Sequence, residues 1–562
     1  MGRSGGRKGY KVFSINTTIR NPDRNVGFLE CFKEFDGKKF SKELQEKYFL
    51  TLVQQGIYHN LNVKQSVKEK LNNKKILTAA EAQESINNNP QATGIPGRVI
   101  TQLRALKDQG FLIFDGGKTP YLISITALGK ELLDGKEHVT DIYSKAMLGL
   151  EANSPARLKV FNKSRPFLNT IFVIKTVNEK CVKLGKKPNG IFKHEFGIFV
   201  LSMKDCDYKR AADRIMNYRS VYGNKINEEY IKKYLFEEQG LIPLNIDSVI
   251  KEYPDDVMRK FQMTGLLMTH GAYQNIFYNF SNYNMKKVES LIRDYKDYKY
   301  IQYSTKQDYY NAMANIILPW QAEDSVRIGI IEHKAETLGK KITNFENLTK
   351  IEDELDKDFY ANSLNKAISK SNLDITLKEL NYLSSTKKYK SKYSSVSEPL
   401  RLEYLIALAL GKKFKTRGLQ SNIIYNEEGY PISFAGAGKS DVIYRYEEAA
   451  ITFEPTMIKN RNQQLNSETT NVCRHMQNVI KEYQKEVKTM MIAPYVHPDV
   501  ANYFKYRAFE DKLKIAPISI NEFVELVKKS DSIQAFGKNF DSDVLLLLEN
   551  NTNKYCQIMN GK

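Results

Sequence analysis

The chain has 562 residues, too many for one hydrophobic core, so its length predicts two to four domains. Lys and Arg outnumber Asp and Glu by 85 to 65, and the formal net charge of +20 favours a polyanion such as nucleic acid as ligand. Five scattered cysteines without a CxxC pair argue against a zinc or redox motif, and no signal peptide or membrane-length apolar run is present. We therefore expect a cytoplasmic protein with reduced thiols. A Lys-rich composition also follows from an AT-rich genome, so charge alone does not identify the ligand.

Residues 97–133 predict a helix, a short hairpin and a second helix. Gly110 ends the first helix, and Gly116-Gly117 turns the hairpin. This helix has an apolar stripe of Ile100, Leu103 and Leu106, with three polar side chains off the stripe: Arg98, Gln102 and Arg104. The layout is that of a winged helix-turn-helix, whose helix enters the DNA major groove. Winged helices also serve as protein–protein spacers, and the sequence leaves that alternative open.

Residues 254–292 predict a second module of the same kind. Asp255 or Asp256 is expected to cap its helix, and Gly265 follows that helix. The expected strands lie near 266–269 and 275–280, with a turn at His270-Gly271. Two such modules in one basic chain favour double-stranded DNA with a specific sequence as the ligand.

The fold class that we predict is α+β multidomain, with a mixed-sheet α/β domain at the C-terminus. From residue 300 to about 398 the chain is polar and helical in character and ends in a basic, serine-rich segment, which predicts a linker with a boundary near 385–398. The predicted domains are 1–150 with the first winged helix, 151–299 with the second, the linker 300–398 and the C-terminal domain 399–562.

The stretch SDVIYRYEEAAITFEPT predicts a β-hairpin that brings two carboxylates together. If Glu447-Glu448 form a two-residue turn, Asp441 lies directly opposite Glu454, and their Cβ atoms are roughly 4.5–5.5 Å apart. Two carboxylates at that distance repel unless a proton or a cation lies between them. Mg²⁺ prefers oxygen ligands of this kind, and the carbonyl of residue 455 offers another.

This arrangement is similar to the PD-(D/E)xK nuclease superfamily, in which an aspartate precedes an acid that is followed two residues later by a lysine. The position of that lysine is occupied here by Thr456, which carries no charge. The PD-(D/E)xK fold is therefore our expectation for residues 399–562, with a departure at Thr456.

A wider resemblance covers most of the chain. LEYLIAL, GKSDVIY, ITFEPT and SETTNVCRH resemble the cleavage domain of the AlwI-type restriction endonucleases, a type IIS family that also contains strand-nicking enzymes. KVFSINTTIRNPDR resembles the opening segment of that family, and the first winged helix matches in layout. Family members also tend to carry threonine in place of the superfamily lysine.

The resemblance implies a prokaryotic enzyme that hydrolyses DNA phosphodiester bonds at a fixed distance from a short asymmetric site. It implies that Glu403, Asp441 and Glu454 bind Mg²⁺, which lowers the pKa of the attacking water. Glu468 and His475 lie seven residues apart on one helix face, and His475 is expected to orient the water or contact the phosphate. Five residues are expected to contact DNA bases: Arg20, Asn21, Arg98, Gln102 and Arg104.

Alternatives remain open at this level. A nicking enzyme that cuts one strand would have the same motifs, as would a DNA-binding regulator with a vestigial nuclease domain. An ATP-driven enzyme is disfavoured, because FAGAGKS has Ser433 where a P-loop needs glycine. We expect a monomer in solution whose cleavage domains pair transiently on DNA, and a DNA methyltransferase in the host that protects its own sites.

Overall fold

The computed structural model describes residues 12–561 except for several stretches. Its description leaves out residues 1–11, 17, 20–21, 56, 59–76, 89–94, 117–119, 136–137, 157–161, 238–239, 241–244, 271–275, 386–390, 392, 394–395, 397, 434–439, 448, 459–460, 462–463, 466–468 and 562. Gly117 and Gly271, on which the two predicted hairpin turns depend, therefore lie outside the described residues. No helix in the described part of the chain is long and apolar enough to span a membrane.

The chain divides into two compact units. The N-terminal unit comprises residues 1–49, 94–271 and 275–355, and the C-terminal unit comprises residues 50–93, 272–274 and 356–562. The division between Leu355 and Asp356 falls inside helix α16, Leu348–Lys370, which lies in the predicted linker range. Helix α17, Leu373–Ser384, belongs to the C-terminal unit, because its leucines are buried in the same core as helix α18.

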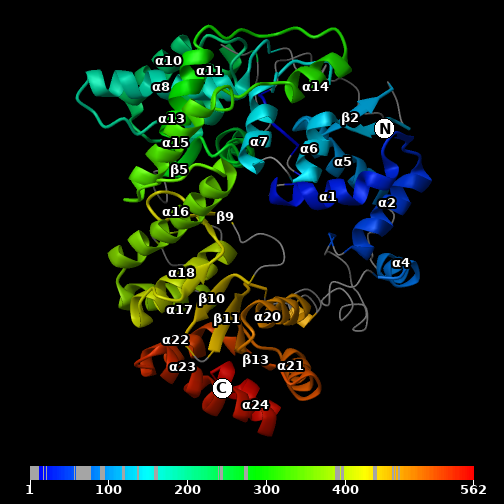
Figure 1. The fold of residues 1–562 in the computed structure, drawn as a ribbon, viewed down its shortest axis with the longest axis vertical. Helices are drawn as coiled ribbons and strands as arrows, with labels where there is room; N and C mark the ends of the chain where they lie inside the picture. The colour runs from blue at the N-terminus through cyan, green and yellow to red at the C-terminus, as the bar shows by residue number, and fades with distance from the viewer. Residues whose placement is uncertain are drawn as a thin grey trace. The chain divides into compact units, whose positions relative to one another are not determined.

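The first predicted module is present as a helix, a hairpin and a helix (Figure 1). Its elements in chain order are α1 (Asn25–Phe32), β1 (Lys38–Lys39), α2 (Lys42–Gln54), α5 (Ile95–Asp108), β2 (Leu112–Asp115), β3 (Leu122–Ile125) and α6 (Ala127–Asp134). Helix α4, Ala79–Asn87, follows α2 in the chain and belongs to the C-terminal unit with the other described residues of 50–93. The sheet order is β1-β3-β2, because the upstream strand pairs with the second strand of the hairpin. Gly110 has a φ of +92° between α5 and β2, a conformation that favours glycine.

The second module repeats this order of elements. It consists of α8 (Pro166–Lys183), β4 (Ile191–Phe192), α9 (Lys193–Glu195) with the π-helical segment η4 (Phe196–Val200), η5 (Ser248–Glu252) with α12 (Tyr253–Gln262), β5 (Leu267–His270), β6 (Phe277–Phe280) and α13 (Met285–Asp294). Helices α10, Tyr208–Tyr222, and α11, Glu228–Glu237, follow η4 in the chain and precede η5. The sheet order is β4-β6-β5, and Gly265 has a φ of +72° before β5. Both modules therefore share one topology.

The predicted helix cap in the second module is wrong. Helix α12 continues directly from η5, so Asp255 and Asp256 lie inside its first turn rather than at its cap. Their carboxylates instead pair along the helix, with Arg259 at 3.0 Å and with Lys260. The two cations of helix α12 are consequently neutralised by two acids of the same helix.

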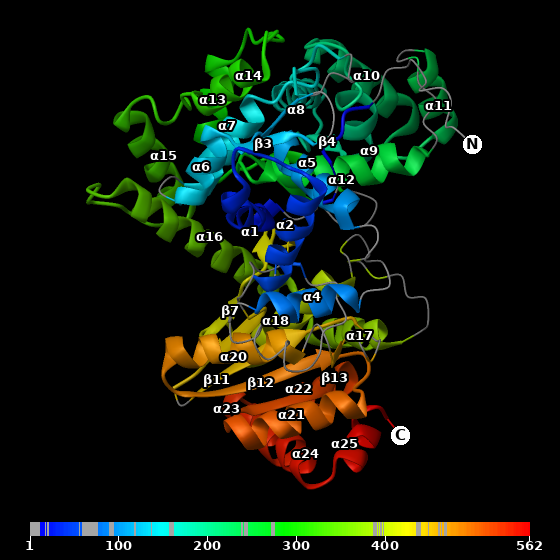
Figure 2. The same ribbon diagram turned by 90° about the vertical axis from the view of Figure 1, so that its right-hand side faces the viewer.

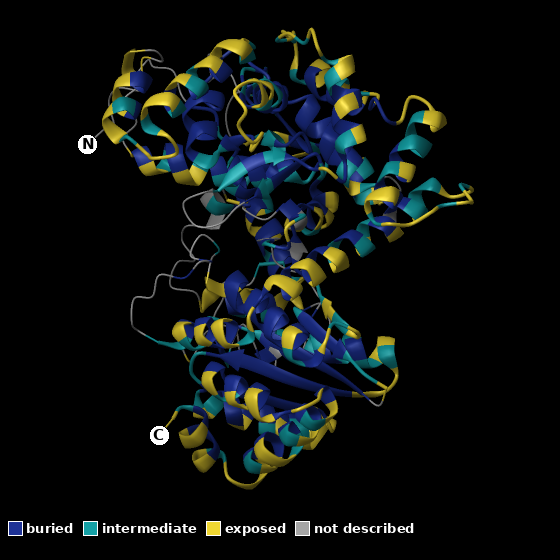
Figure 3. Ribbon diagram, turned by 90° about the vertical axis from the view of Figure 1, so that its left-hand side faces the viewer, coloured by how far each residue is buried: buried dark blue, intermediate teal, exposed yellow. Residues whose placement is uncertain are grey.

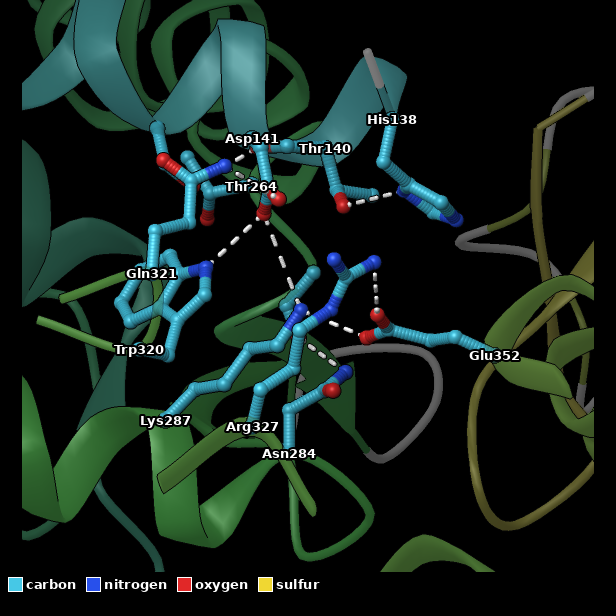
Figure 4. Close-up of polar contacts among 12 residues, drawn as sticks. His138, Thr140, Asp141, Thr264, Asn284, Lys287, Trp320, Gln321, Arg327 and Glu352 are labelled. Atoms are coloured by element: carbon cyan, nitrogen blue, oxygen red, sulfur yellow. Dashed lines mark hydrogen bonds and ion pairs between the residues drawn. The ribbon is translucent and has the colours of Figure 1, made fainter. Parts of the chain in front are cut away.

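A buried polar network joins four helices of the N-terminal unit and the segment that carries Trp320 (Figure 4). Lys287 of α13 contacts Asp141 of α7 (Val139–Leu148) at 3.7 Å and Glu352 of α16 at 2.7 Å. Lys334 of α15 (Asp324–Thr337) contacts the same Glu352 oxygen at 2.7 Å. Trp320 donates its indole N–H to Asp141 at 2.9 Å. Because these groups are buried, each charge needs the partners it has.

The C-terminal unit is built on a five-stranded mixed sheet, as expected for an α/β domain. Its order is β13-β12-β11-β10-β7, with β13, β12 and β11 parallel and β10 antiparallel to both neighbours. The strands are β7 (Leu419–Ser421), β10 (Val442–Arg445), β11 (Ala449–Pro455), β12 (Glu486–Ala493) and β13 (Lys514–Ser519). A separate two-stranded sheet pairs β8 (Ile424–Tyr425) with β9 (Pro431–Ser433). The central strands are buried on both faces, which explains their continuous apolar runs (Figure 3).

Helices cover both faces of this sheet (Figure 2). Helices α20 (Thr469–Tyr483) and α21 (Pro498–Asp511) pack on one face with Ile443 and Ala450. Helix α18 (Glu398–Phe414) packs on the other face with Val442 and Phe453. That face also carries α22 (Ile520–Lys529), α23 (Ile533–Asn539), η7 (Phe540–Leu545), α24 (Leu546–Asn550) and α25 (Thr552–Met559). Helix α18 is apolar around most of its circumference, as a helix enclosed by other elements must be.

Candidate functional site

The hairpin of β10 and β11 has the predicted register. Val442 pairs with Phe453, and Arg445 pairs with Ala450. The Tyr446 N–H donates to the Ala449 carbonyl at 2.9 Å, which closes a two-residue connection. Asp441 directly precedes the Val442–Phe453 pair and Glu454 directly follows it. The two carboxylates therefore flank the same end of the hairpin.

The Glu454 carboxylate lies on the face of the sheet that α20 covers. Side chains alternate along a strand, so Glu454 of β11 shares its face with Ala450. From α20, His475 donates its Nδ1–H to Glu454 Oε2 at 2.7 Å. Glu454 is 4% exposed, and its Oε1 has no hydrogen-bond partner in the described structure. A buried carboxylate oxygen without a donor is a position suited to a cation.

Thr456, at the position of the superfamily lysine, is buried and engaged by backbone groups. Its own N–H donates to the Ile492 carbonyl at 2.8 Å, and its hydroxyl accepts from the Ile458 N–H at 3.2 Å. Thr456 thus shapes the chain after β11 and brings no charge to the site.

Glu403 lies on helix α18, as expected, and is buried. Helix α18 packs on the face opposite to the one that Glu454 occupies. No three Asp, Glu, His or Cys side chains within the described ranges are placed to hold a metal ion together. The structure therefore brings His475 to Glu454 on one face of the sheet, with Asp441 directly before the neighbouring strand β10.

Arg474 is a residue of the site that no sequence motif indicated. It precedes His475 on α20, its Nη2 donates to Asn471 Oδ1 at 2.9 Å, and its buried Nε has no partner. Burial lowers the pKa of Arg474, and the nearby Glu454 carboxylate opposes that shift. An arginine on a helix has no characteristic spacing, so the sequence alone offered no signal for it.

The predicted DNA contacts are described only in part. Arg20, Asn21 and Glu468 lie outside the described residues. On α5, Arg104 is exposed and Arg98 is half-buried, so both reach the surface of the helix. Gln102 differs from the expectation: it is 6% exposed, because the buried face of α5 is wider than the predicted stripe. In this conformation Gln102 is not available to a base edge.

The chain matches one family model and is similar to solved structures of restriction endonucleases. A family model described as AlwI restriction endonuclease matches residues 110–526. No curated protein matches. Among solved structures, the small subunit R.BspD6I2 of the heterodimeric restriction endonuclease R.BspD6I is 19% identical, with a TM-score of 0.28, over 34% of this chain and 98% of that one. Restriction endonuclease FokI is 11% identical, with a TM-score of 0.23, over 94% of this chain and 99% of that one.

The two structural similarities are too low to support an argument, whereas the family match spans most of the chain, including the paired carboxylates and α20. This chain therefore belongs to the AlwI restriction endonuclease family and is a site-specific nuclease.

Proposed function

We propose that this chain is a type IIS endonuclease that binds a short asymmetric sequence in double-stranded DNA and hydrolyses phosphodiester bonds outside that sequence with Mg²⁺. The observation that carries the proposal is the register of β10 and β11, in which Asp441 and Glu454 flank the Val442–Phe453 pair. The buried Glu454 Oε1, which has no hydrogen-bond partner in the described structure, is an oxygen of the kind that a hard divalent cation prefers. We assign the C-terminal unit to the PD-(D/E)xK superfamily on the same ground.

In this mechanism Asp441 and Glu454 would hold the ion. When bound, Mg²⁺ would supply a water of lowered pKa and stabilise negative charge on the phosphate. Water oxygen forms a bond to phosphorus as one P–O ester bond breaks, and a proton from the water ends on the departing sugar oxygen. His475 fixes Glu454 through Nδ1 and can contact water or phosphate through Nε2, which has no partner among the described groups. Glu403 and Glu468 remain proposed members of the site.

Sequence recognition is assigned to the N-terminal unit, whose two modules each have the order of elements of a winged helix. Helix α5 is our candidate for the major groove, with Arg104 exposed and Arg98 half-exposed. Helix α12 is a weaker candidate, because Asp255 and Asp256 neutralise its two cations. Arg20 and Asn21 of the opening segment are proposed to add base contacts, and Gln102 only if α5 repacks on DNA.

Incubation of supercoiled plasmid with Mg²⁺ tests the proposal. The wild-type chain should cut, and Asp441→Asn should cut at least about 100-fold more slowly, the scale of losing one electrostatic contact in a transition state. Asp441→Asn should still retard DNA that carries the site. Asp531→Asn, an exposed aspartate of the same unit, is the matched control and should cut normally. Intact plasmid with the wild-type chain at low salt, or equal cutting by Asp441→Asn, would refute the proposal.

The form of the product separates double-strand cleavage from nicking. One active site cuts one strand, so linear product should rise with enzyme concentration if two cleavage domains meet on DNA. Nicked circles at every concentration would instead identify a strand-specific nicking enzyme. Sequencing the cut ends gives the recognised bases and the distance to the cut. Methylation of those bases should protect the plasmid if a host methyltransferase accompanies the enzyme.

A further inference from the structure

The nuclease site lacks a cation at the position where its superfamily has one. Thr456 is neutral, and its hydroxyl is engaged with the Ile458 N–H. The phosphate of a diester carries a full negative charge, which increases on the equatorial oxygens as water attacks. A preorganised positive charge at that point is among the strongest contributions to catalysis. The charge must therefore come from another element if the proposed chemistry is to proceed.

Arg474 is half-buried beside Glu454 and forms no ion pair within the described structure. Three buried cations that the structure describes in the C-terminal unit each have a carboxylate partner. Arg401 is 3.7 Å from Glu398, Lys488 is 2.6 Å from Asp541, and Arg507 is 2.7 Å from Asp511. These three are thus occupied in holding the fold together.

The guanidinium of Arg474 is positioned but incompletely bonded. Asn471, one helical turn earlier, accepts from Nη2 at 2.9 Å and orients the plane of the group. Its Nε is buried without an acceptor, while Glu454 Oε1 is buried without a donor. An unsatisfied donor and an unsatisfied acceptor of opposite charge on one face of the sheet are costly to bury. A phosphate and a cation bound together would satisfy both.

We propose that Arg474 donates from α20 to a non-bridging oxygen of the scissile phosphate, and so takes the role of the lysine that Thr456 replaces. This inference rests on the proposed function. A guanidinium is suited to the task, because it stays protonated and its planar N–H groups match two phosphate oxygens. Because Arg474 lies on α20, the site keeps a positive charge although the chain after β11 carries the buried, neutral Thr456.

Single-turnover cleavage of a DNA duplex with Mg²⁺ tests the assignment. Arg474→Ala should slow cleavage by about 10²–10³-fold, the effect of removing one donor to a developing negative charge. Its affinity for the same duplex, measured with Ca²⁺ in place of Mg²⁺, should stay unchanged. Millimolar guanidinium ion should restore part of the rate of Arg474→Ala, and Arg474→Lys should cut faster than Arg474→Ala.

The matched control is Arg445→Ala, which removes an arginine from the same sheet at the far end of β10. Arg445 is 3.2 Å from Glu482 and should be dispensable for cleavage. Normal cleavage by Arg474→Ala would overturn the inference. Slow cleavage that guanidinium does not rescue, together with a lowered melting temperature, would show a structural role and overturn it too. If Asp441→Asn is inactive while Arg474→Ala is active, only this inference fails; if the wild-type chain does not cut, the proposed function fails first.

Discussion

Glu151 is a carboxyl group without exposure to solvent in the N-terminal unit. Arg165 Nε lies 3.1 Å from Glu151 Oε1. Burial raises the pKa of Glu151 to about 8, and the Arg165 charge and a backbone hydrogen bond from Ile301 oppose that shift only in part. The neutral form is therefore favoured in the folded state up to mildly alkaline pH.

The raised pKa of Glu151 predicts a loss of stability as pH rises from the ordinary glutamate pKa to about 8. Because the pKa in the folded state is raised, the contribution of Glu151 is full below the unfolded value and is lost as pH rises through about 8. Where the folded and unfolded pKa values differ by one, the free energy of unfolding changes by about 1.4 kcal/mol. Between pH 6 and pH 9 the wild-type free energy of unfolding should therefore fall further than that of Glu151→Gln.

Urea denaturation followed by tryptophan fluorescence is the measurement. Trp320 is the only tryptophan of the chain and lies in the same unit, so its emission reports on the unfolding of that unit. Glu179→Gln removes an exposed carboxylate 2.7 Å from Lys175 and should keep the wild-type pH dependence. Parallel curves for wild type and Glu151→Gln would contradict the assignment.

At the scale of elements, Glu352 of α16 forms ion pairs with Lys287 of α13 and Lys334 of α15. Burial alone would raise the pKa of Glu352, but the Lys287 and Lys334 ammonium groups outweigh burial and hold that pKa well below its ordinary value. One carboxylate thus compensates two buried lysines from different helices. Removal of one member of such a group leaves uncompensated charge in the interior.

Glu352→Gln should lower the free energy of unfolding of the N-terminal unit by about 3–5 kcal/mol at neutral pH. The advantage of the wild type should shrink on acidification below the ordinary glutamate pKa, because a depressed pKa contributes stability only above the unfolded value. Glu289→Gln breaks an exposed pair with Lys286 and should cost at most about 1 kcal/mol. The same fluorescence titration measures both, and equal losses would argue against a buried network.

The elements themselves were largely predictable from the sequence. The hairpin could be placed because Val442 to Phe453 is apolar on both sides of a short polar turn, and only one register fits a two-residue connection. The start of α12 was not predictable, since η5 continues into it without a cap residue. The burial of Gln102 was missed because periodicity gives the direction of the buried face of a helix but not its width.

The candidate site was predictable only where one hairpin carries it. Asp441 and Glu454 are close in sequence, so local register sets their geometry. The contact of His475 with Glu454 depends on how α20 packs on the sheet, which no local pattern encodes. Arg474 could not be predicted for the same reason. Glu403 was included because of the family resemblance, and it lies on α18, which packs on the opposite face of the sheet.

At the scale of the whole molecule, the net charge of +20 predicts a steep dependence of DNA binding on salt. Cations released from the phosphates drive association, so affinity falls linearly with salt on logarithmic axes. If the chain contacts about 6–10 phosphates, affinity should drop by about 10³–10⁵ between roughly 50 and 200 mM salt. Fluorescence anisotropy of a labelled duplex measures the slope.

Arg104→Ala should lower the affinity for the recognised sequence more than for an unrelated one. An equal loss on both sequences would show that Arg104 contacts the DNA backbone instead of a base.

The shared topology of the two modules bears on how a nuclease of this kind acquires a new target. One ancestral module, copied in tandem, would leave each copy free to change by itself. The first copy presents Arg104 on α5, while the second pairs its α12 cations with its own acids. If both modules contact DNA, substitutions can change the bases that one module recognises while the other module maintains binding to the duplex. The recognised sequence can then change in small steps, without an intermediate protein that no longer binds DNA.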